Sequence, residues 1–354
     1  MESLEFDSIR SKRICKTQRC GRLSNMELLR IISMFGVLIV HADFGVLGHP
    51  SNVEITTMPL FAFVRTMIEA FAIVAVNVFV MLSGWFGITF RWEGLCKLIF
   101  QCLFFTFGIY IACIGWGVEV FSIEGIRKCL MLTENVWFIK CYLGLYILAP
   151  AMNIYVEKAK RKTVRNTLLC FFAFQSLYDW IAHSTTFIQG GYSAFSFIGL
   201  YLLARYVHVY RPAWSKYSKS RDFFIYCVLS LFTCAFFLLF AFYDKPIVIL
   251  RFMDYSSPFI IVAALFILLL FSKFSFQSKL INFIAVSCLA VYLQHFIIFP
   301  RFMNVWIKNI TNETEGIWMM ICITGLLIAF FVTAILIDKL RLLLWNRLFA
   351  PMFK

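Results

Sequence analysis

Long apolar segments recur along almost the whole of this 354-residue chain and constrain its fold more than any other feature. A helix needs about 20 apolar residues to cross a bilayer. Helices also satisfy their own backbone hydrogen bonds, as a chain in lipid must. The sequence therefore predicts an all-α fold, a polytopic membrane helix bundle of about ten transmembrane helices. We expect the spans at residues 28–47, 68–89, 95–117, 136–156, 166–183, 195–210, 222–243, 250–272, 280–303 and 316–338.

Composition and charge favour a membrane protein over one that binds nucleic acid. Charged residues make up only 15% of the chain, against about 25% in a typical soluble domain. The net charge of +14 comes mostly from Lys and Arg in short connections, about four times as many on one side of the membrane as on the other. The positive-inside rule places that side in the cytoplasm. We expect a basic cytoplasmic tail at 1–23, a transmembrane domain at 24–340 and a short cytoplasmic tail at 341–354.

The first apolar segment contains ionisable residues that a plain membrane anchor lacks. Arg30 and His41 are eleven residues apart, which returns them to nearly the same helix face with about 16 Å of axial separation. A cation near one membrane surface and an imidazole near the bilayer middle therefore look into one cavity. Intramembrane ionisable groups are costly and mark candidate functional sites. Asp43 faces nearly the opposite way, so it is a poor candidate to orient His41.

The second and third spans add small, polar and basic residues. Asn77 and Ser83 lie near the middle of the membrane, where such residues are usually helix-packing devices. Arg91 and Lys97 follow on the cytoplasmic side. They are explained either by membrane topology or by contact with an anionic ligand.

Two pairs of polar residues are spaced four apart, as neighbours on one helix face are. Arg65 and Glu69 are explained either by a structural ion pair, which we expect, or by contact with a substrate. Asp179 and His183 lie near the outer end of the fifth span, and either interface hydrogen bonding or acceptor binding explains them. In the ninth span, His295 is a second intramembrane imidazole. A lone buried histidine is usually structural, but two in one bundle favour a shared polar cavity.

Four motifs, taken in this order, give the chain a family resemblance. They are Arg30 and His41 separated by ten residues, the Phe-x-x-x-Ser-Gly-aromatic stretch from Phe79 to Trp85, the Trp-Phe-Ile…Tyr-Leu…Tyr…Pro stretch from Trp137 through Tyr142 to Pro150, and Tyr-Leu-x-His from Tyr292 to His295. The chain resembles the acyltransferase-3 family of integral-membrane O-acyltransferases. It looks most like the stand-alone bacterial members that acetylate surface polysaccharides, which implies a place in the bacterial cytoplasmic (inner) membrane.

The resemblance implies transfer of an acyl group, usually acetyl, from acyl-CoA to a sugar hydroxyl of a surface or exported polysaccharide or a lipid-linked glycan. It implies no bound cofactor, and the 12 scattered cysteines show no metal-ligand spacing. We expect His41 and Arg30 to be the catalytic residues. Candidates for binding the donor or acceptor are Asn77, Ser83, Trp85, Arg91, Lys97, Trp137, Tyr142, Asp179, His183 and His295.

The expected chemistry leaves the role of His41 open. A buried imidazole should be neutral, so His41 can accept the hydroxyl proton as a general base, or its ring nitrogen can take the acyl group first. Arg30 is placed to bind the coenzyme's phosphates, although the family often shows an Arg pair near the third helix where this chain has only Arg91 and Lys97. The alternative function is a membrane transporter or flippase of lipid-linked glycans, which would also bury charges but would not need Arg and His at this spacing.

Overall fold

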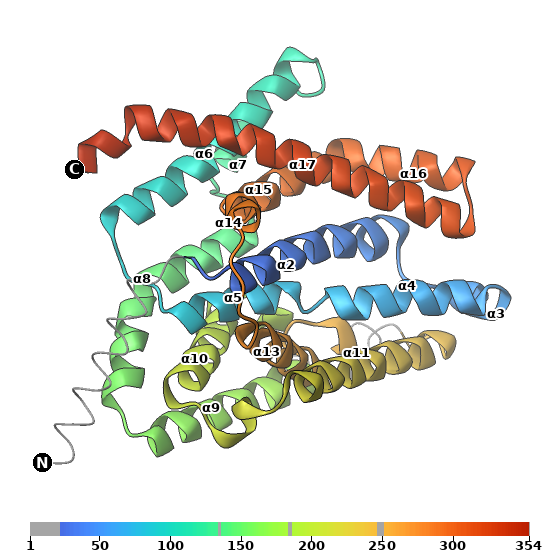
Figure 1. Cartoon of the computed structure of the whole chain (residues 1–354). Coiled ribbons are helices and arrows are strands. Elements are labelled where there is room, and N and C mark those ends of the chain that lie inside the picture. The colour runs from blue at the N-terminus through green and yellow to red at the C-terminus, as the bar shows by residue number, and fades with distance from the viewer. Residues whose placement is uncertain (1–21, 134–135, 183–185, 246–250, 354) are drawn as a thin grey trace, which may run out of the picture.

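The computed structural model describes residues 22–133, 136–182, 186–245 and 251–353, and these residues form helices without a strand among them (Figure 1). The first half contains α2 (Ser24–Ala42), η1 (Asp43–Leu47), α3 (Asn52–Thr57), α4 (Pro59–Ala72), α5 (Ala75–Phe86), α6 (Trp92–Gly115), α7 (Ile123–Cys129), α8 (Trp137–Lys158), α9 (Arg161–Gln175) and η2 (Ser176–Ile181). The second half contains η3 (Gln189–Gly191), α10 (Ala194–Tyr210), η4 (Ala213–Lys216), α11 (Lys219–Phe242), α13 (Pro258–Ser272), α14 (Lys279–Ala285), α15 (Cys288–Ile298), η5 (Phe299–Met303), α16 (Asn304–Glu313), α17 (Gly316–Leu348) and η6 (Ala350–Phe353).

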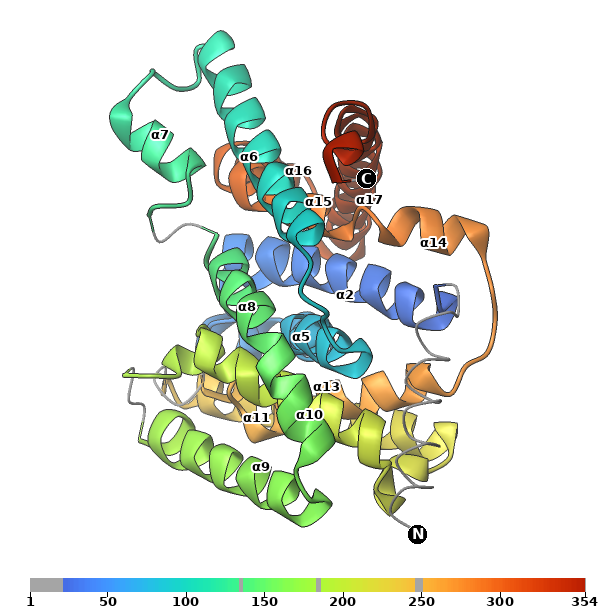
Figure 2. The ribbon, with the colours of Figure 1, turned by 90° about the vertical axis from the view of Figure 1, so that its left-hand side faces the viewer.

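Eight stretches of the described chain are long and apolar enough to cross a membrane. They are Ser24–Leu47, Pro59–Phe86, Trp92–Gly115, Trp137–Lys158, Lys219–Phe242, Arg251–Ser272, Cys288–Glu313 and Gly316–Leu348. The fifth and sixth expected spans fall on α9 and α10, which are helical and lie in the same bundle (Figure 2). The prediction of a polytopic all-α membrane bundle is confirmed. α17 continues as one helix to Leu348, past the expected end of the membrane domain at residue 340.

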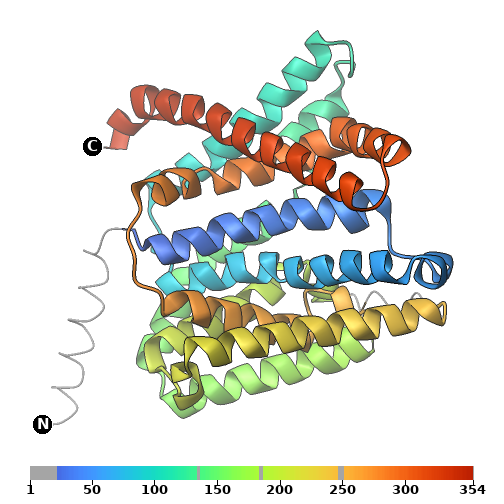
Figure 3. The same ribbon diagram turned by 45° about the vertical axis from the view of Figure 1, so that its right-hand side comes forward.

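The central helix of the bundle is α2, which has α4, α5, α13, α14, α15 and α17 as neighbours (Figure 3). Hydrogen bonds fix its start to the end of α13, the start of α14 and the connection between them. The buried Ser24 hydroxyl donates to the side-chain oxygen of Asn282 at 3.0 Å and accepts from the backbone N–H of Ser278. The Asn25 amide donates to the carbonyl of Phe271 at 2.9 Å. These long-range contacts determine where α2 enters the bundle.

The Phe79–Trp85 motif lies where α5 packs against α10. A Cβ on Gly84 would collide with the backbone of Tyr201, so the close approach of the two helices requires glycine. The Ser83 hydroxyl bonds the carbonyl of Phe79, one turn back, and Trp85 packs edge-on against His208 with ring centroids 4.7 Å apart. Gly84 therefore lets α5 and α10 approach closely, as small residues usually do in membranes. Trp85 packs against the same helix, α10.

We predict that Gly84→Ala lowers the stability of the folded protein by about 1–3 kcal/mol, because the added methyl forces α5 and α10 apart. The apparent melting temperature of the detergent-solubilised protein measures this. Gly108→Ala on α6 is the matched control, since nothing lies within 4 Å of the position of its Cβ. Equal melting temperatures for the two variants would contradict this account of the motif.

Candidate functional site

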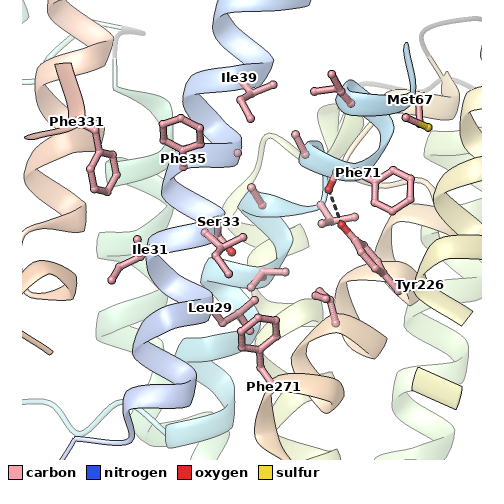
Figure 4. A pocket seen from close by; sticks show the side chains of 18 of the residues that line it. Leu29, Ile31, Ser33, Phe35, Ile39, Met67, Phe71, Tyr226, Phe271 and Phe331 are labelled. Carbon is pink, nitrogen blue, oxygen red and sulfur yellow. Dashed lines mark hydrogen bonds between the residues drawn. The ribbon is translucent and has the colours of Figure 1, made fainter. Parts of the chain in front are cut away.

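An apolar cleft of 820 Å³ lies between α2, α4, α5, α11, α13 and α17 (Figure 4). Among its lining side chains, Ser33 and Tyr226 are the ones with hydroxyl groups, and the others are hydrophobic. The Tyr226 hydroxyl already donates to the Phe71 carbonyl at 2.8 Å. This cleft therefore contains no general base or strong nucleophile for group transfer.

A smaller cavity of 470 Å³, which we call the histidine cavity, lies at the other end of α2 from Arg30. It forms where the end of α2, the end of α6, α7, the start of α8, the end of α15 and η5 meet. Its charged and imidazole side chains are His41, Glu119, Lys128, His295 and Arg301. A concave site with a few convergent polar groups is the usual form of a small-molecule site, and 470 Å³ is within the common range of about 300–1,000 Å³.

The two imidazoles meet in this cavity. The ring centroids of His41 and His295 are 4.8 Å apart, and the ring of Phe299 packs edge-on against both. His295 is only 1% exposed. Among the described residues neither of its ring nitrogens has a hydrogen-bond partner of good geometry. Buried polar groups are normally satisfied, so this imidazole is available to a ligand or to His41.

Contacts within α15 explain why His295 faces α2. The side-chain amide of Gln294 donates to the carbonyl of Ala334 at 2.9 Å, which ties this face of α15 to α17. The next residue then points toward α2, and Tyr292, one turn back on the same face, packs against His295 with ring centroids 5.1 Å apart. The α-helix changes to the π-helical η5 at Phe299, which shapes the cavity wall.

Arg30 lies at the opposite end of the same helix face. Its guanidinium pairs with Glu27 at 2.7 Å, and its side chain is 30% exposed. Arg30 and Lys339 are both close enough to act electrostatically on Cys288 of α15. Since His41 contacts the same helix seven residues further on, at His295, both residues of the motif face α15. The expectation that Arg30 and His41 share one face agrees with this arrangement.

The buried Arg65 corrects one expectation from the sequence. Its guanidinium donates to Asp43 at 2.6 and 2.8 Å, to Glu54 at 2.7 Å and to the carbonyl of Gly48 at 2.7 Å. The expected pairing with Glu69 was wrong, because tertiary packing brings two other carboxylates to Arg65. The contacts with Asp43 and Gly48 fix the chain directly after His41. Asp43 is therefore bound to Arg65, which agrees with the expectation that it does not orient His41.

The aromatic residues of the third motif lie next to the histidine pair. Phe138 packs between Tyr142 and Tyr292, with centroids 5.9 and 5.2 Å away. The Tyr142 hydroxyl lies 3.3 Å from the Ser83 hydroxyl. Trp137 points away toward Tyr192, with centroids 4.5 Å apart. Tyr142 and Ser83 thus connect to His295 through aromatic packing, and neither lines the cavity.

The other candidates lie elsewhere. The buried Asn77 donates to the carbonyl of Tyr255 at 2.9 Å, and the buried Asp179 accepts from the backbone N–H of Gly190 at 3.0 Å; neither residue lines the histidine cavity. His183, the expected partner of Asp179, lies outside the described residues. Arg91 is exposed and Lys97 is half-buried on α6. The structure does not bring these two to the histidine cavity.

Sequence reasoning missed three charged residues of the cavity. Glu119 follows the end of α6, Lys128 is on α7, and Arg301 is in η5. Arg301 donates to the Glu119 carboxylate and to the carbonyl of Ile297. Of these three, only Arg301 could have been noticed in the sequence, because it is a cation six residues after His295 and inside an expected span. Nothing in the sequence indicated that the connection after α6 folds back over η5.

Comparison with known protein families agrees with this geometry. The model of the acyltransferase-3 family, described as an acyltransferase domain, matches residues 23–337. The chain therefore belongs to this family and is an integral-membrane acyltransferase. A search of curated proteins and a search of solved structures each found no match. Family membership favours group transfer over the transporter or flippase that the sequence had left as an alternative.

We predict that Arg65→Gln lowers stability by about 2–4 kcal/mol, because it leaves the partly buried carboxylates of Asp43 and Glu54 without their cation. The melting temperature of the solubilised protein should fall accordingly. Arg127→Gln is the control, since its pair with Glu124 is more than half exposed on both sides and such pairs contribute little. If the melting temperatures of Arg65→Gln and Arg127→Gln are equal, the contacts around Arg65 do not hold the end of α2.

Proposed function

We propose that this acyltransferase moves an acetyl group from acetyl-CoA to a sugar hydroxyl of a surface or exported polysaccharide, in the bacterial cytoplasmic membrane with both termini in the cytoplasm. The observation that supports it most strongly is the contact of His41 with His295 in a polar cavity. Alcohol attack on a thioester needs a group to take the hydroxyl proton, and histidine is the usual one near neutral pH. The four-to-one bias of Lys and Arg between connections supports the orientation.

The donor and the acceptor reach His41 from opposite ends of α2 in this proposal. One guanidinium nitrogen of Arg30 is paired with Glu27, and the side chain is 30% exposed; in this proposal its remaining N–H groups bind the phosphates of acetyl-CoA through charge-assisted hydrogen bonds. The pantetheine arm then spans the roughly 16 Å of helix between Arg30 and His41. The histidine cavity, at the other end, takes the sugar.

The reaction proceeds by direct transfer. His41 accepts the proton of the sugar hydroxyl while its oxygen attacks the thioester carbonyl carbon. The carbon–sulfur bond of the tetrahedral intermediate then breaks, the ester remains on the sugar, and the departing thiolate takes the proton from His41. His295, in ring contact with His41, keeps that imidazole oriented through this cycle.

We predict that His41→Ala lowers acetyl transfer by about 10²–10⁴-fold, which is the usual contribution of a positioned general base. Radiolabelled ester on de-O-acetylated polysaccharide, and free CoA thiol, both measure this in purified proteoliposomes. His49→Ala is the control, because His49 lies near the same end of α2 but outside the cavity lining. Full transfer by a folded His41→Ala protein would rule out this role. Radiolabel bound covalently to the wild-type protein before acceptor is added would replace direct transfer by an acetyl-histidine route.

A second prediction tests the donor site. Arg30→Gln should raise the KM for acetyl-CoA about tenfold or more, since it removes a charge-assisted contact. It should change the rate with S-acetylpantetheine little, because this donor lacks the nucleotide and its charges. Arg91→Gln tests the other cation that the sequence offered. If Arg91→Gln raises the KM for acetyl-CoA and Arg30→Gln does not, the donor binds away from the α2 face.

A further inference from the structure

Lys128 is the cation of the histidine cavity whose charge is not already neutralised. It lies on α7, is exposed, and contributes to the cavity lining. Its side-chain ammonium has no ion pair or hydrogen bond with another described residue, although its backbone carbonyl accepts from the backbone N–H of Met131. Its neighbour Arg127, in contrast, pairs with Glu124 and does not line the cavity.

The other polar groups of the lining are largely occupied within the protein. Arg301 is bound to Glu119, so their charges cancel. The Thr106 hydroxyl donates to the carbonyl of Cys129 at 2.8 Å, and the Tyr110 hydroxyl accepts from the backbone N–H of Ser122 at 2.9 Å. The groups left to meet a ligand are the imidazoles of His41 and His295, at the ends of α2 and α15, and the ammonium of Lys128 on α7.

We propose that the acceptor has an anionic group close to the hydroxyl that is acetylated, and that Lys128 binds this anion. The inference rests on the proposed acetyl transfer and names the class of its acceptor, an acidic glycan. An ammonium is a point charge that pairs well with carboxylate or phosphate. A cavity with one unneutralised cation concentrates anionic ligands and disfavours wrong partners. The sugar hydroxyl then lies toward His41 while the acidic substituent lies toward α7.

Two anionic groups of glycans could pair with this ammonium, namely the carboxylate of a uronate-type sugar and a phosphodiester. The probe is polysaccharide from cells that lack this gene, freed of ester by mild base. One portion is left intact, a second has its carboxylates reduced to alcohols, and a third has its phosphodiesters removed with aqueous hydrofluoric acid. Acetyl transfer from radiolabelled acetyl-CoA is measured for each portion with the wild-type protein in proteoliposomes.

The inference predicts that one of the two treatments lowers wild-type transfer about tenfold or more, the size expected for loss of a charge-assisted contact. The treatment that does so identifies carboxylate or phosphate. Lys128→Gln should raise the KM for the intact polysaccharide by a similar factor and remove the difference between treated and intact portions. Lys128→Arg should retain the preference, and Arg127→Gln should behave as wild type.

Several outcomes would overturn this inference. Equal wild-type transfer to all three portions would show that the acceptor's charge is not recognised. An equal loss for every portion in Lys128→Gln would assign Lys128 to the fold or to lipid headgroups. Unchanged kinetics in a folded Lys128→Gln protein would also refute it. Failure of the proposed function is distinct, because the wild-type protein would then transfer acetyl to none of the portions.

Discussion

The position of α2 depends on buried polar groups that hold it at both ends. At its start, Ser24 is bonded to Asn282 of α14 and Asn25 to Phe271 of α13; directly after its end, Arg65 binds Asp43 and Gly48. Buried charges and polar groups are stable only when paired, so each contact specifies one placement of the helix. That placement of α2 brings His41 into contact with His295. The chemistry proposed for the histidine cavity depends on this contact.

The parts of the account that could be predicted from sequence follow from local periodicity. Apolar segments of sufficient length predicted the helices, and the ten-residue separation predicted that Arg30 and His41 share a face, because both depend only on the geometry of one helix. A second histidine in the ninth span favoured a shared polar cavity, and the structure places His295 against His41. The helix-packing interpretation of the small residues near Ser83 agrees with the position of Gly84 against Tyr201.

The rest could not be predicted because it depends on packing between segments far apart in the chain. Arg65 and Glu69 have ideal spacing for a pair, yet Arg65 binds Asp43 and Glu54 from other elements. Glu119 and Lys128 gave no signal, because the path of a connection determines whether its residues reach a site. The expected fifth span at 166–183 falls on α9, which is helical and lies in the bundle but has only 15 residues, because the sequence did not show where that helix ends.

The central claim is that His41 receives the acetyl donor and the sugar from opposite ends of α2. Sidedness of transfer in sealed vesicles of known protein orientation tests it most directly. Radiolabelled acetyl-CoA is placed on one side and de-O-acetylated polysaccharide on the other. The account predicts labelled ester only when acetyl-CoA is on the side of Arg30 and polysaccharide is on the side of the histidine cavity. Labelled ester formed with both substrates on one side, and none across the membrane, would contradict it.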